Sequence, residues 1–172
     1  MSKILFDVSD PDLRHAFLQH DVISALVPLR EDDVPRRGGM SARQMVEHLV
    51  WTFELSTGRA AVEPSQLAVG VPGARDFLHN GPTPLGLTNP ALISGLPPLR
   101  YATLAQARAA LGWEVARFLE EAVHTEEIRA HPIFGLLRHE EWHRKHYKHS
   151  YHHLRRFGLI EAEQRGVPSE LP

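Results

Sequence analysis

The chain has 172 residues and a formal net charge of −2 at pH 7 when its 12 histidines are counted as neutral. That length suits one domain with a single core, and the small charge leaves no basic excess to neutralise nucleic-acid phosphates. The absence of cysteine excludes disulfides, Cys-based zinc sites and a thiolate nucleophile.

The N-terminal stretch MSKILFDVSDPDLR lacks the apolar run and the small-residue cleavage site of a signal peptide. No stretch approaches the roughly 20 apolar residues that a membrane span needs. A single cytoplasmic domain over residues 1–172 is therefore expected, without a nucleic-acid or membrane partner.

A first helix is predicted after Ser9 or Asp10, either of which can cap it, with Pro11 in its first turn. The helix is expected to end near Pro28, because the residue before a proline disfavours the helical conformation. The charged stretch 30–39 is then expected to be a loop.

A second helix is predicted to begin at the capping box formed by Ser41 and Gln44. Met45, Leu49 and Phe53 repeat at helical spacing along one face, and His48 lies on the neighbouring row. Gly58 is a typical C-terminal signal for this helix.

Residues 58–102 are expected to form a long crossover. Seven of the 13 prolines and six of the 12 glycines lie between Gly58 and Leu99. Structureless connections of this length are uncommon inside a compact domain. A segment that wraps the body is therefore expected, with a short helix at 74–79, and it either forms a lid or pocket wall or simply covers the core.

A third helix is predicted after the Thr103 and Gln106 capping box, and a fourth over residues 139–158. The tail at 166–172 is expected to fray. No strand and no internal repeat is predicted. Four helices with one long connection predict an all-α four-helix bundle, in which the crossover lets the second and third helices run parallel.

The fourth helix carries a candidate metal site. His149 and His153 lie only ~40° apart on one face, and such an i, i+4 pair can bind one metal ion. A third ligand must come from elsewhere, and His48 is the best candidate because it lies in mid-helix beside an apolar row. A buried imidazole there needs a partner, which is a metal or, more commonly, a hydrogen-bonding side chain.

Other assignments of the histidines stay open at this point. The alternative pairs are His139 with His143, His146 with His149, and His149 with His152. A solvated, histidine-rich face is a further alternative.

The motifs around these histidines resemble those of the DinB/YfiT-like superfamily of metalloenzymes, and among its members the DUF1569 branch. That branch has a Trp-Gly-x-Met-x-x-x-Gln-Met-x-x-His stretch, then His-Pro-x-Phe-Gly, then Tyr-Lys-His-x-x-His-His-x-x-x-Phe-Gly. The matching positions are Gly39, Met40, Gln44, Met45 and His48; His131, Pro132, Phe134 and Gly135; and Tyr147, Lys148, His149, His152, His153, Phe157 and Gly158. The tryptophan of the first motif is replaced here by Arg37 or Gly38.

The resemblance implies a four-helix bundle with one long crossover and a divalent ion bound by His48, His149 and His153. Nickel or zinc is the expected ion, with iron or manganese as alternatives. His131, His143 and His146 could join the site. An open coordination position would activate water or bind an incoming thiol.

No side chain stands out as a general base. Glu47, Glu54 and Glu114 are interpreted as solvated helix-face charges, and Trp51, Trp113 and Trp142 as core or pocket walls. His131 either reaches a pocket or stabilises a turn, and Tyr147 and Tyr151 point away from the histidine pair.

Three functions therefore remain. The first is a metal-dependent enzyme that acts on a small molecule by hydrolysis or by transfer to a low-molecular-weight thiol. The second is a non-catalytic metal-binding bundle, and the third is a structural or interaction protein without metal. A homodimer is compatible with each of them.

Overall fold

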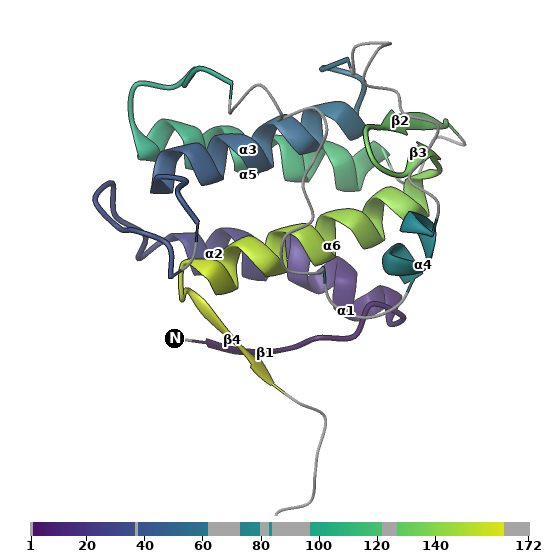
Figure 1. The fold of residues 1–172 in the computed structure, drawn as a ribbon, viewed down its shortest axis with the longest axis horizontal. Helices are drawn as coiled ribbons and strands as arrows, with labels where there is room; N and C mark the ends of the chain where they lie inside the picture. The colour runs from purple at the N-terminus through teal and green to yellow at the C-terminus, as the bar shows by residue number, and fades with distance from the viewer. Residues whose placement is uncertain are drawn as a thin grey trace, which may run out of the picture.

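The computed structural model describes residues 2–36, 38–61, 73–79, 83, 97–121 and 127–163. The described part is mostly helical, with two small two-stranded sheets (Figure 1). The helical elements are α1 Pro11–Ala16, the π-helical η1 Phe17–Asp21, α2 Val22–Leu26, α3 Ala42–Ser56, α4 Ala74–His79, α5 Leu104–Glu121 and α6 His139–Arg156. The strands are β1 Ser2–Leu5, β2 Arg129–His131, β3 Gly135–Leu137 and β4 Ile160–Glu163.

The first helix begins where the sequence predicts. The Asp10 carboxylate caps it by accepting hydrogen bonds from the backbone N–H of Asp12, at 3.1 Å, and of Leu13, at 3.0 Å. The predicted single helix is interrupted, however, by the π-helical turn η1 between α1 and α2. A π turn inserts one residue and so rotates the side chains that follow it by about 100°. A broad apolar side over a short helix hides a shift of this size.

The longer helices follow the predicted starts. The Ser41 hydroxyl accepts from the Gln44 N–H, and the Gln44 side chain accepts from the Ser41 N–H, which completes the predicted capping box of α3. At α5, the Thr103 hydroxyl accepts from the Gln106 N–H, as predicted. The Gln106 side chain accepts from the Ala102 N–H, whereas a complete capping box would have it accept from Thr103. At α6, Glu141 accepts from the Arg138 N–H.

The predicted parallel pair of helices is present. In Figure 1, α3 and α5 run in the same direction, while α6 and the α1–η1–α2 rod run the opposite way. The predicted short helix of the crossover is α4, Ala74–His79. Residues 62–72, 80–82 and 84–96 of the crossover lie outside the described residues, as does the tail predicted to fray at 166–172.

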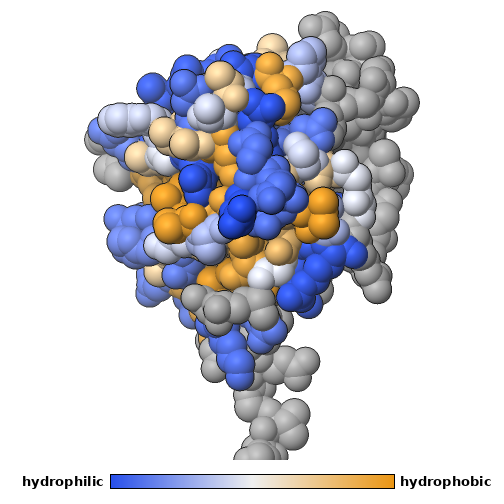
Figure 2. Space-filling view, turned by 90° about the vertical axis from the view of Figure 1, so that its left-hand side faces the viewer, coloured by the Kyte–Doolittle hydropathy of each residue, from blue (hydrophilic) through white to orange (hydrophobic). Residues whose placement is uncertain are grey.

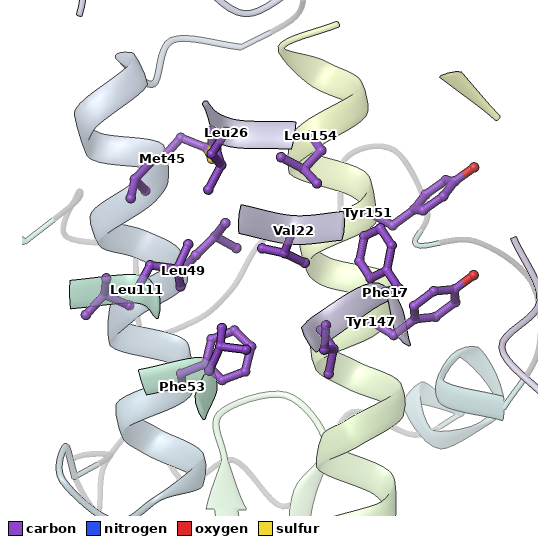
Figure 3. Close-up of a cluster of buried hydrophobic side chains, with 14 of the residues drawn as sticks. Phe17, Val22, Leu26, Met45, Leu49, Phe53, Leu111, Tyr147, Tyr151 and Leu154 are labelled. Carbon is purple, nitrogen blue, oxygen red and sulfur yellow. The ribbon is translucent and has the colours of Figure 1, made fainter. Parts of the chain in front are cut away.

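One core joins the rod, α3, α5 and α6. Figure 3 shows side chains from each of these elements facing a shared interior. The labelled members are Phe17, Val22, Leu26, Met45, Leu49, Phe53, Leu111, Tyr147, Tyr151 and Leu154. Burial of each large apolar side chain stabilises the fold by about 1.5–3 kcal/mol, so this core fixes α3 against α6.

The prediction of no strands is wrong. β1 pairs with β4 in parallel, from Ser2 opposite Ile160 to Leu5 opposite Glu163, and β2 pairs with β3 in an antiparallel hairpin. Strands of three or four residues are too short to show an alternating pattern. Side chains of α6 hold β1 in place, because the Tyr147 hydroxyl donates to the Leu5 carbonyl at 3.1 Å and the Tyr151 hydroxyl to the Ile4 carbonyl at 2.9 Å.

The surface at one end of the helices is mixed in polarity. Figure 2 shows the side that lies at the left of Figure 1, where apolar areas are separated by hydrophilic ones. Within the described part of the chain, no helix is long and apolar enough to cross a membrane.

Candidate metal centre

Three histidines from two helices converge at one point between α3 and α6. His48, His149 and His153 each direct a ring nitrogen to this point, and the three nitrogens lie within 4.8 Å of one another. The Nε2 atom of His149 lies 3.0 Å from Nε2 of His48 and 3.2 Å from Nε2 of His153. The structure thus brings together the three residues that the sequence singles out, and they are called the histidine cluster below.

Local structure explains the convergence. His149 and His153 are one turn apart on α6, so their side chains share a face of that helix. His48 lies in the middle of α3, whose neighbouring residues Met45 and Leu49 are completely buried in the core. Core packing on both helices therefore determines the distance across the cluster.

Hydrogen bonding alone does not satisfy the cluster. A ring nitrogen carries either a proton or a lone pair, so Nε2 of His149 cannot donate to one neighbour and accept from the other. Nδ1 of His48 is also buried, with no hydrogen-bond partner among the described residues. Because Nδ1 lies on the far side of the ring from Nε2, an ion at the cluster would not satisfy it. The incomplete pairing of Nε2 of His149 is what indicates a further group at this site.

The spacing of the nitrogens suits a metal ion. Nitrogens about 2.0–2.1 Å from one ion lie roughly 3.0 Å apart at right angles and roughly 3.4 Å apart in a tetrahedron. The two separations from Nε2 of His149, 3.0 and 3.2 Å, lie in this range, and the ring nitrogens of His48 and His153 lie within 4.8 Å of each other. Three imidazoles are a donor set that suits nickel, zinc or iron, so the residues present fit a divalent ion.

The surroundings keep the cluster histidines neutral. Burial, and secondarily the nearby Lys145, lowers the pKa of His48 to about 3 and that of His149 well below its usual range. Burial, followed by the effect of His48, also holds the pKa of His153 well below 6.5. Neutral rings keep the lone pairs that metal binding requires.

Lys145 is a buried amine beside the cluster. Its side chain is only 5% exposed, and its Nζ lies 3.4 Å from Nδ1 of His149 and 5.7 Å from the centroid of the Trp142 ring. Burial lowers the pKa of Lys145 well below its usual value. The sequence contained a signal for this residue, because positions 145, 149 and 153 follow one another at spacings of four on one helix face.

The other candidate histidines have different partners. Nδ1 of His131 accepts the backbone N–H of Ile133 at 3.0 Å and of Phe134 at 3.3 Å, so this residue stabilises the turn after β2. Nε2 of His146 lies 2.8 Å from the Ser56 hydroxyl. His143 is buried beside Phe118 and His15. Within the described part of the chain, neither these residues nor the alternative pairs form a second three-ligand group.

The interpretation of three glutamates as solvated charges is wrong. Glu47, Glu54 and Glu114 are 7%, 6% and 4% exposed. Glu47 accepts the backbone N–H of residues 100 and 101, and Glu54 and Glu114 pair with Arg100 and Arg59. Their burial depends on segments far away along the chain, which a helical periodicity does not report.

The three tryptophans differ in their surroundings. Trp142 is buried in the core, as predicted. Trp51 lines a pocket of about 140 Å³ beside His48, and its ring centroid is 6.0 Å from that of His48. Trp113, predicted to be a core or pocket wall, is 76% exposed on α5. Tyr147 and Tyr151 pack on Phe6 and Phe17, away from the cluster.

A scan of protein-family models, a search of curated proteins and a search of solved structures each found no match to this chain. Function is therefore inferred from the geometry of the cluster and from the sequence motifs that surround it.

Proposed function

We propose that this protein is a divalent-metal-dependent enzyme that acts on a small molecule by hydrolysis or by transfer involving a low-molecular-weight thiol. His48, His149 and His153 would bind the ion. The observation that carries the proposal is the convergence of three histidine ring nitrogens within 4.8 Å, from the buried His48 and His153 and the half-buried His149. Hydrogen bonds alone cannot pair Nε2 of His149 with both of its neighbours there.

The sequence motifs support the same assignment. The resemblance to the DinB/YfiT-like superfamily and its DUF1569 branch rests on residues that include all three cluster histidines. On this proposal the α1–η1–α2 rod, α3, α5 and α6 are the four helices of that family's bundle, with the crossover between the second and third. The parallel course of α3 and α5 agrees with it (Figure 1).

Three neutral imidazoles leave a divalent ion its full charge and an open coordination position, where it acts as a Lewis acid toward a substrate. Nickel or zinc is the proposed ion, with iron or manganese as alternatives. The chain itself would position the ion through the rigid spacing of α3 and α6. Because the chain has no cysteine, a reactive sulfur must arrive on a cosubstrate.

One observation favours a second candidate, a metal-binding bundle without catalytic activity. The buried carboxylates Glu47, Glu54 and Glu114 are bound to backbone N–H groups or guanidinium groups, so none is directed at the cluster as a general base. Lys145 is the buried titratable group, apart from the histidines, that contacts the cluster among the described residues. An enzyme would therefore have to use Lys145 or the substrate's own groups for proton transfer.

Elemental analysis of tag-free protein tests metal binding. The wild type is expected to contain about one divalent ion per chain after reconstitution, and the His149→Ala/His153→Ala variant none. His152→Ala is the matched control, because this histidine lies on α6 between the two ligands and is outside the cluster. No ion in the wild type after reconstitution with nickel, zinc, iron and manganese would refute the proposal.

Activity separates the enzyme from the non-catalytic bundle. Metal-loaded wild type and the His149→Ala/His153→Ala variant would be assayed on amide and ester substrates and on electrophiles offered together with a small thiol. Turnover by the wild type that the double variant loses supports the enzyme. Stoichiometric metal without turnover on any of these classes supports the second candidate.

A further inference from the structure

The pocket beside His48 has two walls of different origin. Gln44, Glu47, His48 and Trp51 form one wall, on successive turns of α3. Residues 97–100, at the end of the crossover, form the opposite wall and are called the strap below. His48 belongs both to this pocket and to the histidine cluster, so a molecule in the pocket lies next to the candidate metal centre.

The strap and the two residues that follow it are held in place by hydrogen bonds to α3. The Glu47 carboxylate accepts the N–H of Arg100 at 2.7 Å and of Tyr101 at 3.2 Å. The Arg43 guanidinium donates to the carbonyls of Tyr101 at 3.1 Å and Ala102 at 2.5 Å. The pocket is therefore formed before any ligand arrives.

The charged side chains around the pocket are already paired by hydrogen bonds within the protein. Glu47 is bound to the N–H groups of Arg100 and Tyr101, and the Arg100 guanidinium donates to the Glu54 carboxylate at 3.0 Å. What remains on the walls is mainly the Trp51 indole and the side chains of Pro97, Pro98 and Leu99. Such walls favour an apolar, uncharged group, since a charged one would lose hydration without gaining a partner.

The size of the pocket limits the occupant further. Its volume is about 140 Å³. An apolar protein cavity of about 150 Å³ accommodates one benzene ring. The Trp51 indole offers a flat face against which a planar ring can stack.

We propose that this pocket binds a single uncharged planar ring and holds it beside His48. The ring would be the apolar part of the small molecule on which the proposed enzyme acts, with its reactive group directed toward the histidine cluster. The assignment of the ring to a substrate depends on the proposed function, whereas binding of the ring in the pocket does not.

Titration of metal-free protein with four probes tests the pocket. Benzyl alcohol carries a neutral ring, benzoate an anionic one, benzylammonium a cationic one, and 1-pentanol has no ring. Dissociation constants from NMR titrations are expected to be at least tenfold lower for benzyl alcohol than for the other three. Equal binding of the four probes, tighter binding of a charged probe, or no binding of benzyl alcohol would overturn the proposal.

Two variants locate the binding. Leu99→Glu places a charge on the strap at a position that is 40% exposed, so the fold should tolerate it. Leu136→Glu makes the same change on β3, at a position that is 62% exposed and does not line the pocket. Benzyl alcohol is expected to bind at least tenfold more weakly to Leu99→Glu and unchanged to Leu136→Glu. Unchanged binding to Leu99→Glu would place the ring elsewhere.

Cobalt(II) separates this proposal from the proposed function. In cobalt-loaded wild type, the ring protons of benzyl alcohol should relax faster than in metal-free protein, and this gain should vanish in His149→Ala/His153→Ala. Ring binding without metal loading would refute the metal site and leave the pocket. Metal loading without ring binding would refute the pocket, and ring binding with no change in relaxation would refute its position beside the cluster.

Discussion

At the scale of single residues, His146 shows how this interior pairs one nitrogen of an imidazole without a metal ion. Its ring stacks on Phe53, with centroids 3.7 Å apart and planes at 6°. The Ser56 hydroxyl donates to the Phe53 carbonyl at 2.7 Å, so it accepts the proton on Nε2 of His146 at 2.8 Å. One serine thus pairs Nε2, whereas Nδ1 of His146 is buried without a hydrogen-bond partner among the described residues.

Ser56→Ala should destabilise the protein by about 1–3 kcal/mol, because it leaves the Nε2 proton of His146 buried without an acceptor. Urea unfolding of the metal-free protein would measure the loss. The double variant Ser56→Ala/His146→Phe should recover part of it, since both polar partners are then gone. A neutral effect of Ser56→Ala would show that the hydrogen bond contributes little.

Lys145→Met should make the metal-free protein more stable by at least about 1 kcal/mol. The amine is buried, 3.4 Å from Nδ1 of His149 and 5.7 Å from the centroid of the Trp142 ring, and methionine fills a similar volume without a polar group. Unfolding in urea would measure the change, with Lys3→Met on the exposed side of β1 as a control expected to stay within about 0.5 kcal/mol. A loss of stability would mean that the amine supports His149.

The residues of the cluster could be proposed from the sequence because ligand type and spacing coincide there. His149 and His153 share a helix face because they are four residues apart, and His48 was the best third candidate because it lies in mid-helix beside an apolar row. The family motifs imply the same three residues. Lys145 has the same spacing but is not among the predicted site residues, and lysine is not a usual metal ligand. The burial of Glu47 could not be predicted, since it depends on the strap, which lies about 50 residues further along the chain.

At the scale of elements, helix ends were predictable and short strands were not. Helix starts could be predicted because the capping residues Asp10, Ser41 and Gln44 form hydrogen bonds with neighbouring residues only. β1 and β4 form because Tyr147 and Tyr151 of α6 bind β1 carbonyls, which is a tertiary cause. Local signals therefore predict what local interactions stabilise.

A glycine with a left-handed backbone conformation follows the C-terminal end of α6. Gly158 has φ of 68°, and a Cβ atom at this position would lie 2.7 Å from Nε of Arg36. The loop that carries Arg36 is bound here, because its N–H donates to the Arg156 carbonyl at 2.7 Å. The glycine lets the helix end and the loop approach each other closely.

Gly158→Ala should destabilise the protein by more than about 1 kcal/mol, from the left-handed backbone and from displacement of Arg36. Gly112→Ala is the matched control, because Gly112 lies within α5 with open space around its Cβ position. That change should stabilise the protein by about 0.5–1 kcal/mol. Thermal unfolding of both variants would reveal the opposite signs, and equal effects would refute this reading of Gly158.

At the scale of the whole molecule, buried neutral histidines make stability depend on pH. Burial, followed by the charge of Arg14, lowers the pKa of His143 to about 3. Burial also holds the pKa of His131 and of His146 well below 6.5, with Lys145 as the next cause. The unfolded chain therefore binds more protons than the folded chain once the pH falls below about 6.5.

The contribution of these neutral histidines to the free energy of unfolding should be fully present above pH 6.5. It should be lost steadily as the pH decreases toward 3. Urea unfolding of metal-free protein at pH 7.5, 6 and 5 would measure this decline. His143→Gln should show a shallower decline than the wild type, because glutamine does not titrate. A stability that is constant from pH 7.5 to 5 would contradict the burial of these rings in neutral form.

The pairing of β1 with β4 has a consequence for the order of events in the cell. Residues 2–5 find their partner only when residues 160–163 have been synthesised, and His48 meets His149 and His153 across about 100 positions. While the ribosome is still making α6, the early helices have neither their last strand nor two of the three facing imidazoles. A nascent chain without α6 therefore lacks two of the three imidazoles, so an ion could be bound here only once residues 149 and 153 have left the ribosome.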